Sequence, residues 1–415
     1  MNGERMYSLL EKLNFVRVSA TEAEARAAKI LMDECASFGL DAHEETFETP
    51  DGEVLETKLT VLEPYRKEYD ALGFRRGASV DAEAEVVYIE DGLEANLADV
   101  KGKIVLMNGG IGKDKYEPLL KSGALCVIVG CGDARDNPAD IDLRPGMFRP
   151  IITDKYETRL CAATVRASDL FEMIAKGASR AQVKIKTRDF TGTSRNVVAE
   201  IPGTVFPEQV FAITGHFDSV EYSHGMYDNA AGSAIMMELA RCYKANPPRR
   251  TLRFVWTGSE ERGLLGSKAF VKAHADEVEK TRLCVNLDLA GSIAGHEFAI
   301  VTGPDSLKNH IDMMMKEQGW AVECRADTYS SDCIPFADCG VPAVSIGRFG
   351  APSMSYIHDR RDVIDYVCAP ALEKTGKIAA HFLKRMDDAV LLPFPREMPE
   401  EMKKKVDDYL QKEKK

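Results

Sequence analysis

From Asn196 onward, the chain alternates between short apolar runs typical of buried strands and runs with helical periodicity. Strand-like and helical runs follow one another at 210–214, 230–245, 252–257, 264–273 and 284–289. Such alternation favours parallel pairing, because each helix returns the chain to the same edge of the sheet. The sequence therefore predicts an α/β fold in which helices flank a mostly parallel central sheet.

The segment before Asn196 follows a different pattern. Thr21 and Glu24 form a capping box, and the helical run they begin has an apolar stripe that needs a sheet to cover it. Between about 57 and 190, β-rich runs are separated by Gly- and Asp-rich loops. We therefore expect the chain to leave one domain, form a β-rich insertion that flanks and narrows the active-site crevice, and return. The expected parts are an N-terminal piece, the insertion, the main domain and a charged tail, at 1–58, 59–190, 191–390 and 391–415.

Charge and cysteine content narrow the class of protein. The 54 Lys and Arg against 66 Asp and Glu give a net charge of −12, which argues against a nucleic-acid or anionic-membrane partner. No apolar run reaches the roughly 18 residues of a membrane span, and the first residues lack the apolar core of a signal peptide. The ten cysteines show no CxxC spacing, so we interpret them as free thiols of a cytoplasmic protein. The oligomeric state stays open, a homo-oligomer included.

Acidic and imidazole groups follow the predicted strands where each one ends. His216 and Asp218 follow the first strand, Glu260 and Glu261 the second, and Asp288 the third. The carboxyl ends of parallel strands meet at one edge of a sheet, and ligands bind in the crevice outside that edge. We therefore expect these five side chains to lie close together.

Two further residues extend this pattern. Asp228 precedes the helical run at 230–245, and His358 follows a strand-like run at 343–346. Alone, each has an ordinary explanation, as a helix N-cap and a surface histidine. Carboxylates packed at one edge repel each other unless a cation lies among them, so the joint pattern predicts a metal site. Imidazole and carboxylate ligands without thiolate suit zinc best, with cobalt or manganese as substitutes.

Five motifs in this order resemble those of the co-catalytic di-zinc aminopeptidase family, whose relatives include glutamate carboxypeptidase II and glutaminyl cyclase. The motifs are His216-x-Asp218-Ser219, Asp228-Asn229-Ala230-Ala231-Gly232, Glu260-Glu261-x-Gly263-Leu264-Leu265-Gly266-Ser267, Asn286-x-Asp288-x-x-Gly291 and His358-x-x-x-Asp362. The resemblance covers about residues 194–380 and implies the three-layer zinc-exopeptidase fold. By its pattern, the β-rich insertion is similar to a protease-associated (PA) domain.

The resemblance also implies a ligand set. One zinc would bind His216, Asp228 and Asp288. The other would bind Asp228, Glu261 and His358, so that Asp228 bridges two ions. Formal charge favours the same count, because three ligand carboxylates and a hydroxide are balanced by two zinc ions and not by one.

Further roles follow from the same resemblance. Glu260 would be the general base, and Asp218 would orient His216 through the imidazole nitrogen that does not bind metal. Tyr356 is a candidate oxyanion donor. Arg348 is a candidate contact for a substrate carboxylate, with a salt bridge to a neighbouring aspartate as the alternative.

One segment departs from the family pattern. Ser331-Asp332 and Pro335-Phe336 resemble the family sequence Ser-Asp-His-x-Pro-Phe, but Cys333 occupies the histidine position. We therefore assign no metal to this segment.

The expected activity is zinc-assisted hydrolysis of an amide by an exopeptidase, most simply an aminopeptidase acting on a peptide substrate. Three alternatives stay open at this point. They are a carboxypeptidase or dipeptidase of the same family, a glutaminyl cyclase, and a binding relative that has lost catalysis. The intact ligand set and the Glu260-Glu261 pair favour hydrolysis.

Overall fold

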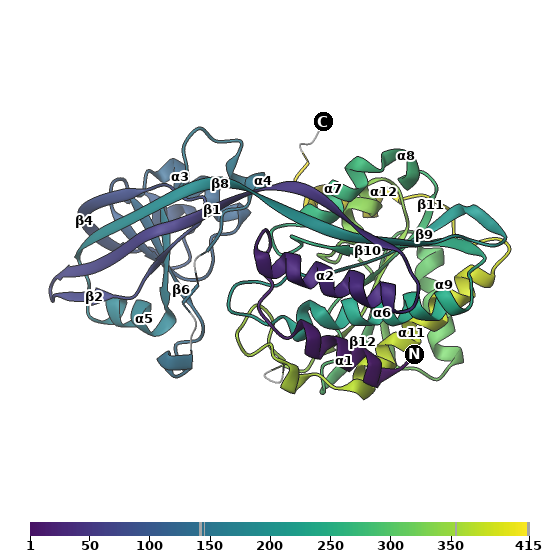
Figure 1. The fold of residues 1–415 in the computed structure, drawn as a ribbon. Helices are drawn as coiled ribbons and strands as arrows, with labels where there is room; N and C mark the ends of the chain where they lie inside the picture. The colour runs from purple at the N-terminus through teal and green to yellow at the C-terminus, as the bar shows by residue number, and fades with distance from the viewer. Residues whose placement is uncertain (141–142, 145, 353–354, 413–415) are drawn as a thin grey trace. The chain divides into compact units, whose positions relative to one another are not determined.

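The computed structural model of the chain describes residues 1–140, 143–144, 146–352 and 355–412, which form two units (Figure 1). Unit 1 consists of Met1–Thr49 and Thr193–Lys415, and unit 2 of Pro50–Gly192. Among the described residues, no helix combines the length and apolar character that a membrane span requires. Each unit has hydrophobic core clusters of its own, and each is described by itself.

The sheet of unit 1 places four parallel strands side by side. Its strands are the end of β8 (Arg180–Ile201), β9 (Phe206–His216), β10 (Arg250–Thr257), β11 (Thr281–Leu287), β12 (Gly295–Thr302), β13 (Val322–Ala326) and β14 (Ala343–Gly350). They are ordered β13-β12-β14-β11-β9-β10-β8. Strands β14, β11, β9 and β10 run parallel, whereas β12 and β8 pair antiparallel with β14 and β10. The mostly parallel mixed sheet expected from the sequence is confirmed.

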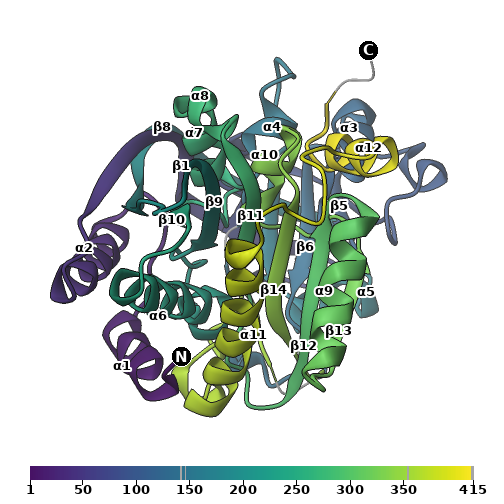
Figure 2. The same ribbon diagram turned by 90° about the vertical axis from the view of Figure 1, so that its right-hand side faces the viewer.

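Helices cover both faces of this sheet (Figure 2). One face carries α1 (Gly3–Leu13), α2 (Glu22–Ser37), α6 (Ala231–Ala245), α9 (Asp305–Glu317) and α11 (Ala369–Asp388). The other face carries α7 (Leu265–Ala273), α8 (Ala275–Val278) and α10 (Cys333–Asp338). Side chains alternate along β9, so Phe211 and Ile213 join the first core and Ala212 the second. The three-layer arrangement is therefore confirmed.

Helix α2 begins at the predicted capping box. Thr21 Oγ1 accepts a hydrogen bond from the Glu24 N–H at 3.4 Å, and the Glu24 carboxylate accepts one from the Ala20 N–H at 2.9 Å. The Ser194 hydroxyl also donates to Glu24, at 2.5 Å. This contact joins the N-terminal helix to the chain where it enters unit 1 again.

Unit 2 is rich in strands. It contains most of β1 (Ala42–Glu63), β2 (Lys67–Tyr69), β3 (Leu72–Gly73), β4 (Val80–Tyr88), β5 (Ile104–Met107), β6 (Cys126–Cys131), β7 (Ala162–Arg166) and the start of β8. Its helices are α3 (Lys113–Ser122), α4 (Pro150–Thr153) and α5 (Ala167–Ala175), with 3₁₀ turns η1 (Glu94–Leu97) and η2 (Pro138–Asp140). The strand order is β8-β4-β5-β6-β7-β3, and β1 pairs with β2 and β8.

The limits of unit 2 differ from those of the expected insertion at 59–190. The unit begins at Pro50 because β1 is one continuous strand that starts in unit 1. The structure also adds α3, which contains Pro118 and which the β-rich pattern did not predict. The similarity of this unit to a PA domain, and its role in narrowing access to the site, stay predictions.

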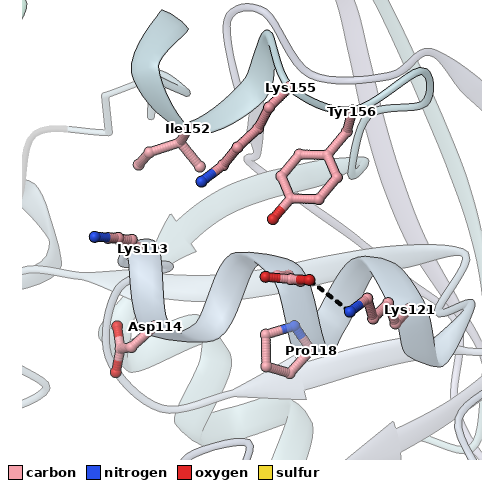
Figure 3. A pocket seen from close by; sticks show the side chains of 8 residues that line it. Lys113, Asp114, Pro118, Lys121, Ile152, Lys155 and Tyr156 are labelled. Atoms are coloured by element: carbon pink, nitrogen blue, oxygen red, sulfur yellow. Dashed lines mark ion pairs between the residues drawn. The ribbon is translucent and has the colours of Figure 1, made fainter. Parts of the chain in front are cut away.

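Unit 2 carries an open groove of about 630 Å³ beside α3 (Figure 3). Ile152, Lys155 and Tyr156 face α3 across it, and Lys121 of α3 pairs with Glu117 at 2.5 Å. The lining carries charges of both signs and includes none of the predicted site residues. The predicted site residues, 216–358, all lie in unit 1.

The expected charged tail, 391–415, contains a packed helix, α12 (Glu400–Tyr409). Its Val406 is 1% exposed and packs with Leu264, Ile334 and Ala337. Although most residues of α12 are charged, Met402 and Val406, four residues apart, form an apolar stripe on one side of the helix. The expected charged tail therefore includes a helix that packs against the unit through one apolar side.

Replacing Val406 with Ala should lower the free energy of unfolding by about 2 kcal/mol, because it removes buried methyl groups. Lys404→Ala on the exposed side of α12 is the matched control and should change it by less than about 0.5 kcal/mol. Chemical denaturation of both variants measures the difference. Equal stabilities would mean that α12 does not dock in solution.

Candidate metal centre

Four neighbouring parallel strands bring the predicted residues to one edge of the sheet. His216 is the last residue of β9, and Asp288 directly follows β11. Glu260 and Glu261 lie in the loop after β10, and His358 lies in the loop after β14. The carboxyl ends of these strands thus supply the groups from separate parts of the chain.

Asp228 reaches the same edge from the turn η3 (Met226–Ala230), which precedes α6. Its backbone N–H donates to the Asp362 carboxylate at 3.1 Å, and the Tyr227 N–H donates to the same group at 2.8 Å. The neighbouring Asn229 side chain donates to the Leu287 carbonyl at 2.8 Å. The turn that presents Asp228 is therefore held on two sides.

The side chains form two groups that share Asp228. His216, Asp228 and Asp288 make up one, and Asp228, Glu261 and His358 the other, with potential ligand atoms within 4.8 Å of one another in each. His216 Nε2 lies 3.1 Å from Asp228 Oδ1 and 3.7 Å from Asp288 Oδ1. His358 Nε2 lies 3.3 Å from Asp228 Oδ2 and 3.0 Å from Glu261 Oε2. The two oxygens of Asp228 thus face different histidines.

Glu260 lies beside the first group. Its Oε2 is 4.0 Å from His216 Nε2, and with His216 and Glu261 it forms a third set of potential ligands. Geometry alone therefore allows Glu260 either to bind a metal or to stand next to one.

Most of the cluster is withdrawn from water. His216 and Asp228 are 2% and 8% exposed, whereas the His358 side chain is 49% exposed and forms the open side. Glu261 Oε1 and Asp288 Oδ1 are buried without a hydrogen-bond partner among the described residues. Buried carboxylate oxygens are normally satisfied, so these two are free to bind a cation.

The pKa values of the carboxylates in the cluster also indicate that a cation belongs there. Burial raises the pKa of Glu261 to about 7, and the nearby Asp228 carboxylate adds to that rise. Burial also raises the pKa values of Glu260 and Asp288 above their ordinary range. At Asp228 burial acts in the same direction, but hydrogen bonds to His216 and His358 outweigh it and hold its pKa low. Protons would gather on these groups unless a cation replaced them.

Asp218 is buried and connects His216 to the Glu260-Glu261 loop. Its carboxylate accepts hydrogen bonds from the N–H groups of Glu260 and Glu261 at 3.1 and 3.3 Å, and from the Ser19 hydroxyl at 2.8 Å. The carboxylate lies 3.5 Å from His216 Nδ1, while the Asp218 carbonyl is closer, at 3.2 Å. Both the carbonyl and the carboxylate of Asp218 thus lie beside the imidazole, and the carboxylate also holds the backbone of the glutamate pair.

The internal partners of Arg348 argue against the predicted contact with substrate, which stays untested. Arg348 donates to Glu297 Oε1 at 2.8 Å and to the Ser292 carbonyl at 2.7 Å, so its guanidinium is already bound inside the fold. Of the alternative partners, Asp359 pairs with Arg361, and Asp362 accepts the backbone N–H groups of Tyr227 and Asp228.

Tyr356 packs between Arg361 and Tyr366. The Arg361 guanidinium lies 4.1 Å from the centre of its ring, and the Tyr366 ring centre lies 6.0 Å away. Its role as an oxyanion donor stays a prediction.

Cys333, at the position of the family histidine, is buried against Ser331 and Ser345, with its sulfur 3.1 and 3.5 Å from their hydroxyls. The neighbouring Asp332 accepts a hydrogen bond from Thr257. The segment is thus part of the packing beneath the site.

No role of Asp362 was predicted from the sequence, and Ser19 was not among the candidate residues. Asp362 stands at the end of the motif His358-x-x-x-Asp362, which was a signal for it, but the motif does not say that its carboxylate accepts the backbone of Asp228. Ser19 has no local signal, because its partner Asp218 lies 199 residues away.

The chain is similar in sequence to known peptidases. Residues 196–383 match the profile of peptidase family M28. The chain is 26% identical over 404 residues to aminopeptidase YwaD of Bacillus subtilis, covering 90% of this chain and 82% of that protein. It is also 26% identical over 293 residues to mouse carboxypeptidase Q, covering 66% of this chain and 61% of the relative.

Two solved structures share the fold. An aminopeptidase from Aneurinibacillus sp. strain AM-1 superposes with a TM-score of 0.74 at 24% identity, covering 92% of this chain and 93% of that one. A zinc aminopeptidase from Bacillus subtilis superposes with a TM-score of 0.77 at 20% identity, covering 95% and 98%.

Replacing Arg348 with Met should destabilise the protein by about 3 kcal/mol, because it removes the closest charged partner of the buried Glu297 carboxylate and leaves it only Thr375 and the more distant Lys374. Arg325→Met is the control, since its pair with Glu323 is exposed and should contribute less than about 1 kcal/mol. Denaturation measures both, and KM for peptide substrates should stay unchanged in folded Arg348→Met. A raised KM at wild-type stability would restore the substrate-binding role.

Proposed function

We propose that this chain, whose residues 196–383 match the model of peptidase family M28, is a zinc-dependent aminopeptidase that removes N-terminal residues from peptides. The observation that carries this proposal is the pair of ligand groups that share Asp228. The similarity to aminopeptidase YwaD along 90% of the chain supports the same activity.

The proposal includes two zinc ions, with cobalt or manganese as substitutes. One would be held by His216, Asp228 and Asp288, the other by Asp228, Glu261 and His358. The donor set supports this choice, because imidazole and carboxylate groups without thiolate suit zinc. When bound, the ions would polarise the scissile carbonyl and make a water molecule more acidic.

Glu260 would move the proton in this reaction. As the general base it takes a proton from the attacking water, and as the general acid it returns the proton to the leaving amine. Its buried carboxylate has a raised pKa, which suits both roles. The hydrogen bond from its N–H to Asp218 keeps the side chain beside His216.

The same site is compatible with a carboxypeptidase or dipeptidase, and the similarity to carboxypeptidase Q favours this second candidate. Aminoacyl-p-nitroanilides, dipeptides and N-blocked peptides, each tested with added zinc, distinguish the two. An aminopeptidase cleaves substrates with a free N-terminus and leaves N-blocked peptides intact. Cleavage of N-blocked peptides would reject the aminopeptidase in favour of the carboxypeptidase. Release of pyroglutamate from glutaminyl peptides, without a free amino acid, would indicate the cyclase.

A cytoplasmic location belongs to the same proposal. All ten cysteines are free, and four of them, including Cys35 and Cys284, are fully buried thiols in the cores of the fold. Such thiols fit a reducing compartment. Cell fractionation that found the protein outside the cytoplasm would contradict this location.

Glu260→Gln should lower kcat by at least about 100-fold, because the amide cannot accept the proton. The zinc content should stay at two ions per chain, since Glu260 is assigned no ligand role. Metal analysis of the purified variant, together with its kinetics, measures both effects.

Glu261→Gln is the matched control, with the same chemical change one residue along the chain. It should lose zinc, and excess zinc should partly restore its activity. The opposite result, with zinc lost from Glu260→Gln and kept in Glu261→Gln, would mean that the two roles are exchanged.

A further inference from the structure

Arg17 lies in the linker between α1 and α2 and is fully buried, at 0% exposed. Its guanidinium makes five hydrogen bonds, all to backbone carbonyls. The acceptors are Leu13, Phe15, Phe217, His224 and Gly225. Two of them belong to its own segment, and three belong to the loop that connects two proposed metal ligands.

That loop runs from His216 to Asp228. Near its start, Arg17 Nε donates to the Phe217 carbonyl at 2.7 Å, and near its end, Nη2 donates to the Gly225 carbonyl at 3.0 Å. Gly225 has a φ of +54°, and a Cβ there would lie 2.5 Å from the Asp228 carbonyl oxygen, so the backbone is tightly packed here. Arg17 thus spans the loop from one residue after His216 to three residues before Asp228.

Neighbouring residues of the linker hold the same loop. The Arg17 N–H donates to Ser219 Oγ at 2.9 Å, and the Ser219 N–H donates to the Arg17 carbonyl at 3.2 Å. Asn14 Oδ1 lies 2.7 Å from His224 Nδ1, and Ser19 donates to Asp218. Three residues of the linker, Asn14, Arg17 and Ser19, therefore form hydrogen bonds with this loop.

Arg17 also places a positive charge behind the acidic cluster. Burial lowers the pKa of Arg17 to about 10, while the carboxylates of Asp362, Asp218 and Asp228 oppose that shift. The guanidinium is therefore charged at neutral pH. Arg17 is thus a buried cation near the site, and it lies outside all five site motifs.

We propose that Arg17 is a positioning residue of the metal centre, which fixes the path of residues 217–227 so that His216 and Asp228 meet at one metal ion. This inference rests on the proposed function, because it requires metal at these residues. It adds a determinant from the N-terminal linker to a site whose ligands all lie after residue 215.

Arg250 offers a matched control within the same chain. It is also 0% exposed, and its guanidinium donates to the carbonyls of Met386 and Asp387. It is the first residue of β10, so it lies at the end of that strand opposite to Glu260 and Glu261. Replacing either arginine with Lys keeps the charge and removes most of the carbonyl contacts.

The experiment compares wild type, Arg17→Lys and Arg250→Lys in two measurements. Zinc affinity is measured by titrating the zinc-loaded proteins with a chromogenic chelator, and stability by thermal unfolding with EDTA. Both variants should lose stability, because both leave buried carbonyls unsatisfied. Only Arg17→Lys should bind zinc more weakly, by about 10- to 100-fold, as expected when a group that orients ligands is removed.

Unchanged zinc affinity in folded Arg17→Lys would overturn the proposal, and so would an equal loss of affinity in Arg250→Lys. If Arg17→Lys does not fold, Ser219→Ala decides in its place, because it removes a milder contact of the same loop. It should weaken zinc binding several-fold at near wild-type stability, and wild-type affinity would reject the role. Wild type that binds no zinc would instead contradict the proposed function itself.

Discussion

Repulsion among buried carboxylates is the constraint on which the rest of this structure depends. Glu260, Glu261 and Asp288 are withdrawn from water beside one another, and each has a raised pKa. Asp228 escapes that rise only because a histidine approaches each of its oxygens. Such a cluster is stable at neutral pH when cations are shared among its members, and two oxygens without hydrogen-bond partners are available to bind them.

The scaffold holds the cluster through backbone groups. The parallel strands end at one edge of the sheet, where His216 and Asp288 lie. Pairing with neighbouring strands limits the backbone motion of both residues. The loops are then held by buried carboxylates that accept backbone N–H groups, Asp362 at Asp228 and Asp218 at Glu260. Arg17 holds a loop in the opposite sense, since its guanidinium donates to backbone carbonyls. These backbone contacts do not involve a metal, so they lower the cost of ordering the ligand-bearing loops when one binds.

The separation of interacting residues along the sequence decides which parts of the fold and the site could be predicted. His216, Glu260, Glu261 and Asp288 each follow an apolar run directly, so a local pattern was enough to bring them together. The pairing of Arg348 with Glu297 was not predicted, because Glu297 lies opposite it on β12 and no local pattern reveals that register. The roles of Arg17 and Ser19 were not predicted for the same reason, because their partners lie some 200 residues away in the sequence. The limit at Pro50 was not predicted, because β1 continues through Pro50-Asp51-Gly52 as one strand.

The most direct measurement is anomalous diffraction at the zinc edge from crystals of the zinc-loaded protein. Asp228, with its oxygens 3.1 and 3.3 Å from two different histidines, should lie between two zinc peaks. The peaks should be about 3.5–4 Å apart, as in other two-metal sites. A single peak, or peaks away from Asp228, would contradict a centre built on one shared carboxylate.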